Sequence, residues 1–93
     1  MLVLPAELTH AQAPACARML AQALRAEPAP VAVADASALQ RFDSSALAVL
    51  LDCRREALAL GKGFAVSGLE PRLRALATLY GVGELLADAA PAA

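Results

Sequence analysis

Aromatic residues are scarce in this chain of 93 residues, which has two phenylalanines, one tyrosine and no tryptophan. Stacking surfaces for bases or sugars are therefore nearly absent. Eight basic residues balance nine acidic residues, and the net charge is −1. An electrostatic nucleic-acid binder would instead show a basic stripe. The composition therefore predicts that nucleic acid is not a partner.

Histidine and cysteine are scarce as well, because His10 is the one histidine and Cys16 and Cys53 are the only cysteines. A zinc site needs more ligands of these types, and a catalytic triad would have to use His10, which falls in an alanine-rich helix start. Both cysteines lie in Ala/Leu-rich helical stretches and are interpreted as small buried hydrophobes. We therefore expect no enzyme activity, no metal site and no cofactor.

Long apolar runs are also missing, since none reaches the roughly 20 residues that a transmembrane helix needs. The first five residues, MLVLP, lack the basic start and extended apolar region of a signal peptide. We therefore expect a cytoplasmic protein without direct membrane insertion.

The hydrophobic pattern alternates between strand-like and helix-like segments. Predicted strands lie at residues 1–4, 31–34 and 64–67, and predicted helices at residues 11–26, 44–60 and 71–80. Thr9 is predicted to cap the first helix, Gly61 and Gly81 to end the other two, and residues 82–86 to form one more helical turn. The apolar run at 31–34 suits a strand buried on both faces. Strand–helix alternation predicts an α/β fold with a small mixed or parallel sheet, in one domain at residues 1–88 with a disordered tail at 89–93.

Each predicted helix carries an apolar stripe that we assign to the core. In the first helix the stripe consists of Ala15, Leu20, Ala23 and Leu24. In the second it consists of Ala46, Leu47, Leu50, Cys53, Ala57 and Leu58. In the third it consists of Leu73, Leu76, Ala77 and Tyr80.

The second helix opens with Asp43, Ser44 and Ser45, and this triplet has two interpretations. Asp43 or Ser44 could simply cap the helix, because unpaired N–H groups at a helix start accept a side-chain oxygen. The same position favours anions, so a phosphate on Ser44 would meet the positive end of the helix dipole. The residues alone leave both interpretations open.

The outer side of this helix has low relief. It carries Ser44, Ser45, Ala48, Asp52, Arg55 and Ala59, with Leu51 at its border. It is either an alanine-rich solvent face or a flat docking face anchored by Leu51. The predicted partner-binding residues are Ser44, Ser45, Ala48, Leu51, Asp52 and Arg55. Arg72 and Arg74, near the start of the third helix, could contact a partner or remain solvated.

Residues 35–51, DASALQRFDSSALAVLL, resemble the signature of STAS domains, in which a buried strand ends in Asp and an Asp-Ser or Asp-Thr motif opens a helix. Residues 73–82, LRALATLYGV, resemble the MlaB-type branch, the STAS subunits of Mla phospholipid ABC transporters. The resemblance covers nearly the whole chain and implies helices packed mainly on one face of the sheet. It departs from the family in three places: Ala46 replaces a common glycine, residues 6–9 read AELT instead of Gly-x-Leu-Asp, and only one of two expected strands fits before Thr9.

The resemblance implies a non-catalytic accessory subunit that binds the ABC transporter ATPase through the helix starting at Ser44 and stabilises or regulates it. The alternative is an anti-sigma-factor antagonist, whose partner is an anti-sigma factor serine kinase that phosphorylates Ser44. The short amino-terminal segment and the third helix favour the transporter branch. A small enzyme is the least favoured interpretation, because histidine, glycine-rich loops and clustered acids are lacking.

Overall fold

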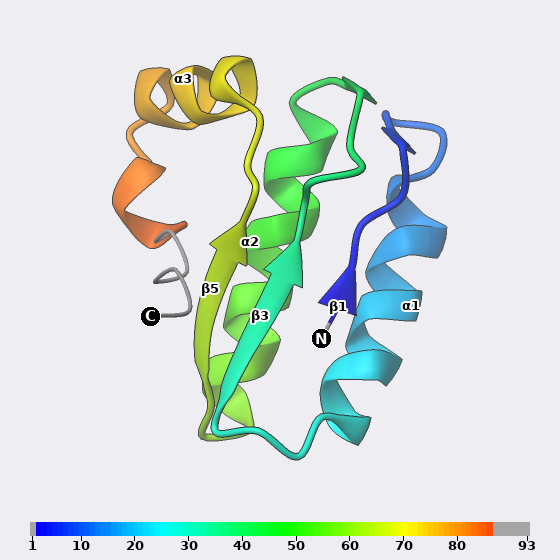
Figure 1. Cartoon of the computed structure of the whole chain (residues 1–93), viewed down its shortest axis with the longest axis vertical. Helices are drawn as coiled ribbons and strands as arrows, with labels where there is room; N and C mark the ends of the chain where they lie inside the picture. Colours follow the sequence, from blue (N-terminus) through cyan, green and yellow to red (C-terminus); the bar gives the residue numbers. More distant parts are fainter. Residues whose placement is uncertain (1, 87–93) are drawn as a thin grey trace.

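The computed structural model describes residues 2–86 of the chain (Figure 1). The predicted tail at 89–93 and the end of the predicted domain lie outside these residues. The strands are β1 (Leu2–Val3), β2 (Glu7–Leu8), β3 (Val31–Asp35), β4 (Arg41–Phe42) and β5 (Gly63–Ser67). The helices are α1 (Ala13–Ala26), α2 (Ser45–Ala59), α3 (Pro71–Leu79) and the 3-10 turn η1 (Gly83–Leu85). The predicted α/β class and the order of the main elements are confirmed.

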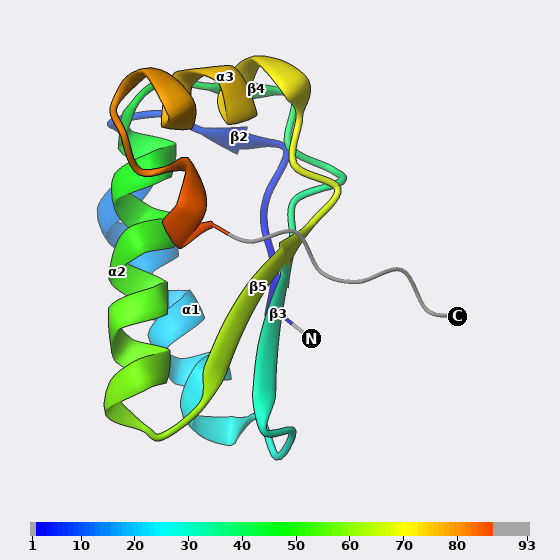
Figure 2. The ribbon, with the colours of Figure 1, turned by 90° about the vertical axis from the view of Figure 1, so that its left-hand side faces the viewer.

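The main sheet has the strand order β1-β3-β5, and all its strands are parallel. Both α1 and α2 cover the same face of this sheet, and no described element covers the other face (Figure 2). Parallel strands connected by helices place each following helix start at the carboxyl end of the sheet. The start of α2 therefore lies at this end, where α3 also lies (Figure 1).

The prediction that the strand at 31–34 is buried on both faces was wrong. Ala32 and Ala34 are fully buried beneath the helices, whereas Val31 is 47% exposed and Val33 is half-buried on the open face. Neighbouring strand residues point to opposite faces, so helices on one side bury only every second residue.

In α1 the buried residues follow a narrower stripe than the sequence predicted. Cys16, Leu20 and Leu24 are buried at intervals of four residues, whereas Ala15 and Ala23 are exposed. Residues four apart share one helix face. None of the alanines of α1 is fully buried, so their positions do not identify the inner face.

The predicted cap of α1 by the Thr9 side chain is also corrected. The Thr9 hydroxyl donates to Gln12 Oε1 at 2.6 Å, and its backbone N–H donates to the same oxygen at 2.9 Å. Thr9 instead uses its carbonyl, which accepts from the backbone N–H groups of Gln12 and Ala13. The helix starts at Ala13, two residues later than predicted, and Gln12 makes no side-chain capping bond.

The predicted glycine stops of α2 and α3 are confirmed. Gly61 and Gly81 have φ values of 73° and 74°, in the left-handed region that a helix-ending glycine adopts at low cost. At the end of α3 the Val82 N–H donates to Ala77 O at 2.9 Å, and the Gly81 N–H donates to Thr78 O at 3.0 Å. This pair of bonds closes the helix as a Schellman motif.

Two short strands precede α1, where the sequence predicted only one. The second, β2, does not join the main sheet but pairs in parallel with β4, with Glu7 opposite Arg41 and Leu8 opposite Phe42. Each strand has only two residues, so neither carries a readable alternation. This small pair brings the segment before α1 next to the segment that enters α2.

Candidate functional site

The start of α2 is held by Asp43. Asp43 Oδ1 accepts from the Ser45 N–H at 2.8 Å, and Oδ2 accepts from the His10 N–H at 3.0 Å. The hydrogen bond from His10 and then that from Ser45 lower the pKa of this carboxyl, because they stabilise its charged form. Asp43 therefore caps α2 and also ties it to the segment before α1, 33 residues away in sequence.

The Ser44 side chain makes no capping hydrogen bond, and the residue is exposed. The sequence left open whether Asp43 or Ser44 caps the helix, and the geometry assigns that role to Asp43. The Ser44 hydroxyl thus faces solvent at the first turn of a fifteen-residue helix. A substitution at Ser44 therefore removes no hydrogen bond on which the helix start depends.

Four of the six residues predicted to bind a partner lie together on one side of α2, whereas Ser44 and Ser45 lie at its start. Ala48, Leu51, Asp52 and Arg55 line a shallow hollow of about 230 Å³. Leu51 is half-buried at its edge and packs against the core, whereas Ala48 is exposed. Asp52 and Arg55 form a surface ion pair one turn further along. Because the small Ala48 side chain lies beside these longer side chains, the surface of α2 is hollowed at this point.

The opposite side of α2 packs inward, as predicted, with one exception and one addition. Ala46, Leu47, Leu50, Cys53 and Ala57 are buried, but Leu58 is 50% exposed, so its assignment to the core was wrong. Val49, which the sequence did not assign to this side, is buried. Leu50 and Ala57 on this packed side have 0% exposure, so the core holds α2 in place and leaves its outer side free.

Arg72 lies next to the entry of α2. Its guanidinium carbon is 5.4 Å from the centroid of the Phe42 ring, a cation–π arrangement, and its Nε atom is 3.3 Å from Glu70 Oε1. The Arg72 side chain nevertheless remains 76% exposed. It therefore contributes an accessible positive group near Asp43 and Ser44, at the same end of the molecule.

The third helix adds an exposed apolar pair that sequence reasoning missed. Leu79 is 78% exposed and Tyr80 is 59% exposed, although Tyr80 was assigned to the core stripe. The stripe ends with the buried Leu73 and Ala77, because the helix stops at Leu79 and Gly81 redirects the chain. The sequence feature that could have indicated an exposed apolar surface here is Leu79, a large apolar residue outside the core stripe of a short helix.

The two thiols lie in the core, as their interpretation as small hydrophobes predicted. Cys16 and Cys53 are both buried and free. Burial raises the pKa of both thiols, that of Cys53 to about 11. Within residues 2–86, no group of three His, Cys, Asp or Glu side chains could hold a metal ion. None of the described helices is long and apolar enough to cross a membrane.

A family model described as "Mlab, STAS domain" matches residues 1–87 of the chain. The chain belongs to this MlaB-type family of STAS domains, as the motifs at 35–51 and 73–82 indicated. STAS domains are in general non-catalytic regulatory domains, and the fold agrees with that family. No curated protein gave a match to the chain.

Proposed function

We propose that this protein is a non-catalytic accessory subunit of an Mla-type phospholipid ABC transporter in the cytoplasm. It binds the transporter ATPase through the outer side of α2 and stabilises or regulates it. The observation that carries this proposal is the hollow lined by Ala48, Leu51, Asp52 and Arg55 on an MlaB-type STAS domain. A surface of this shape accepts a protruding side chain or a helix of a partner.

The chemistry of the face suits protein docking better than solvation. Small exposed residues let a partner backbone approach closely, and Leu51 offers a half-buried apolar anchor. Leu79 and Tyr80, at the end of α3, are further large exposed apolar residues, and burying such area against a partner would favour docking. Tyrosine is enriched among interface residues that dominate binding energy. The Asp52–Arg55 ion pair lines the same hollow, and charged groups of this kind help to set the orientation of a partner.

One observation favours the alternative function, an anti-sigma-factor antagonist. Because Asp43 caps α2, the exposed Ser44 hydroxyl is accessible to an anti-sigma factor serine kinase. A phosphate there would add about −1.5 to −2 charges in the middle of the docking face. The same chemistry that switches an antagonist would therefore weaken binding to any partner on this face.

The test of the docking face compares fold stability with affinity for the ATPase subunit encoded in the same genome. Ser44→Glu and Ala48→Arg place a bulky charge on the proposed face, and both should weaken binding at least tenfold, about 1.4 kcal/mol. Ala23→Arg is the matched control, because Ala23 is an exposed alanine on α1. Isothermal titration gives the affinities and circular dichroism the melting temperatures.

We expect all three variants to melt close to wild type, and only the two α2 variants to lose affinity. If Ser44→Glu and Ala48→Arg bind the ATPase as tightly as Ala23→Arg, the outer side of α2 is not the interface. Incubation with the serine kinase encoded near the gene, followed by mass spectrometry, tests the alternative. Stoichiometric phosphate on Ser44, together with no ATPase binding by wild type, would favour the antagonist.

A further inference from the structure

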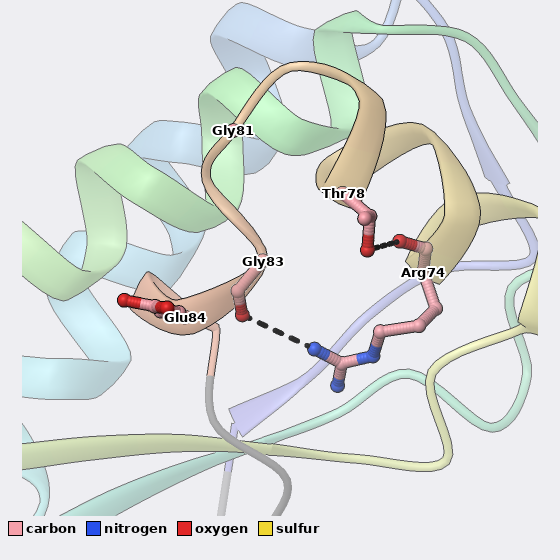
Figure 3. Close-up of a pocket in the computed structure, with 5 residues that line it drawn as sticks. All are labelled: Arg74, Thr78, Gly81, Gly83 and Glu84. Atoms are coloured by element: carbon pink, nitrogen blue, oxygen red, sulfur yellow. Dashed lines mark hydrogen bonds between the residues drawn. The ribbon is translucent and has the colours of Figure 1, made fainter.

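The segment that follows α3 folds back against that helix, and Arg74 holds it there. Arg74 Nη1 donates to Leu86 O at 2.7 Å and lies 3.4 Å from Gly83 O (Figure 3). These two carbonyls lie at either end of η1, so one side chain spans the whole turn. The sequence left open whether Arg74 contacts a partner or solvent, but the half-buried side chain is engaged within the domain.

An arginine suits this position for electrostatic and geometric reasons. The Leu86 carbonyl follows the end of η1, where helical carbonyls lack a partner within the turn and carry partial negative charge. The Gly83 carbonyl, at the start of η1, also accepts from the Leu86 N–H at 3.2 Å. The terminal guanidinium nitrogen Nη1 carries two N–H donors, so this one atom can serve both carbonyls. The Arg74 carbonyl in turn accepts from the Thr78 hydroxyl at 3.1 Å, one turn along α3.

Packing alone leaves this region incompletely filled. A hollow of about 430 Å³ is lined by Arg74, Thr78, Gly81, Gly83 and Glu84. At one point η1 does touch α3, since a Cβ atom on Gly83 would lie 3.3 Å from Thr78 Oγ1. Leu86 then enters the core and is fully buried. Val82 and Leu86, on either side of η1, pack into the core, and the hydrogen bonds of Arg74 add a direct attachment of η1 to α3.

We propose that Arg74 is a positioning residue that latches η1 to α3 and thereby fixes the turn displaying Leu79 and Tyr80. Leu79 is the last residue of the helix that carries Arg74, and Tyr80 follows it, before the turn that Arg74 binds. Holding both ends of this segment limits the orientations of its exposed side chains. Pre-ordered side chains lose less entropy on binding, so the latch would raise partner affinity without contacting the partner. Only this last step rests on the proposed function.

The chain contains its own probe for this latch, because Tyr80 is the single tyrosine and there is no tryptophan. Time-resolved anisotropy of tyrosine fluorescence therefore reports the motion of Tyr80 alone. In Arg74→Ala we expect a larger amplitude of nanosecond motion, and at least tenfold faster amide exchange at Leu85 and Leu86. Arg74→Lys should give values between those of Arg74→Ala and wild type in both measurements, since lysine retains a cationic donor. Arg72→Ala, on the same helix but outside the latch, should behave as wild type in both measurements.

Wild-type exchange at Leu85 and Leu86 in Arg74→Ala, with an unchanged anisotropy decay, would overturn the latch. If Arg74→Ala does not fold, the same two measurements on Arg74→Lys decide, because intermediate values support the latch and wild-type values overturn it. Binding to the ATPase is measured separately. If Tyr80 moves more in Arg74→Ala but the variant binds the ATPase as tightly as wild type, the latch does not contribute to partner affinity. A wild-type protein that does not bind the ATPase counts against the proposed function, while the exchange and anisotropy data still decide the latch.

Discussion

Two adjacent residues of β3 should respond oppositely to the same substitution, because only one of them faces the helices. Ala34 is fully buried under α1 and α2, whereas Val33 is half-buried on the open face of the sheet. We predict that Ala34→Asp does not fold at neutral pH. We predict that Val33→Asp folds with moderately reduced stability, although the sequence alone suggested a strand in which Val33→Asp would unfold the domain.

The size of each effect follows from where the carboxylate would lie. Full burial shifts a carboxyl pKa by up to about 3–5 units, and each unit corresponds to about 1.4 kcal/mol. The penalty at Ala34 is therefore about 4–7 kcal/mol, comparable to the total of roughly 5–14 kcal/mol expected for a domain of this length. At Val33 the carboxylate stays in water. The loss is about 1–2 kcal/mol, from β-propensity and partial apolar burial.

Circular dichroism during heating and urea titration measures both variants. A loss of about 1 kcal/mol lowers the melting temperature of a domain this size by roughly 4–8 °C. Val33→Thr, nearly the same shape without a charge, is the control for the loss of the valine side chain. If Val33→Asp is unfolded, as Ala34→Asp is expected to be, the second face of the sheet is buried and the one-sided architecture is wrong.

Two further predictions concern ionisation. The hydrogen bonds to Asp43 lower its pKa below the usual value near 3.8, so its stabilising effect is present above that value and is lost as the pH falls through the lowered pKa. Urea titrations should therefore show Asp43→Asn less stable than wild type at pH 7, with the difference vanishing on acidification; a difference independent of pH would contradict this. The pKa of Cys53 is raised from 9.0 to about 11, so the buried thiol stabilises the fold below pH 9 and this effect is lost between pH 9 and 11. Native protein at pH 8 should react with a disulfide reagent at Cys16 and Cys53 far more slowly than urea-unfolded protein, and equal rates would show that the thiols are accessible.

Several features followed from the sequence because they depend on local chemistry. Gly61 and Gly81 end their helices where the pattern placed them, since glycine adopts the left-handed conformation without a steric penalty. The buried side of α2 was mostly readable, because leucines repeat there at helical spacing. The motif around Asp43 and Ser44 was sufficient to indicate the family that the match over residues 1–87 shows.

Other features depended on contacts between segments far apart in the chain. In β3 the sequence could not distinguish the faces, because Val31, Ala32, Val33 and Ala34 are all apolar and only the position of the helices separates them. The pairing of β2 with β4 joins residues 34 positions apart through strands too short to show a pattern. The second hydrogen bond of Asp43, from the His10 N–H at 3.0 Å, likewise joins segments 33 residues apart that no local pattern connects.

The sequence by itself thus determined the order of the main elements, the glycine stops of α2 and α3, and most of the buried side of α2. Each of these follows from periodicity or from the conformational preference of a single residue. Only the tertiary structure decided which sheet face is open, that Leu79 and Tyr80 are exposed, and that Arg74 binds the carbonyls of Gly83 and Leu86. The physical reason is that burial and long-range hydrogen bonds depend on how elements pack together, which no local pattern encodes.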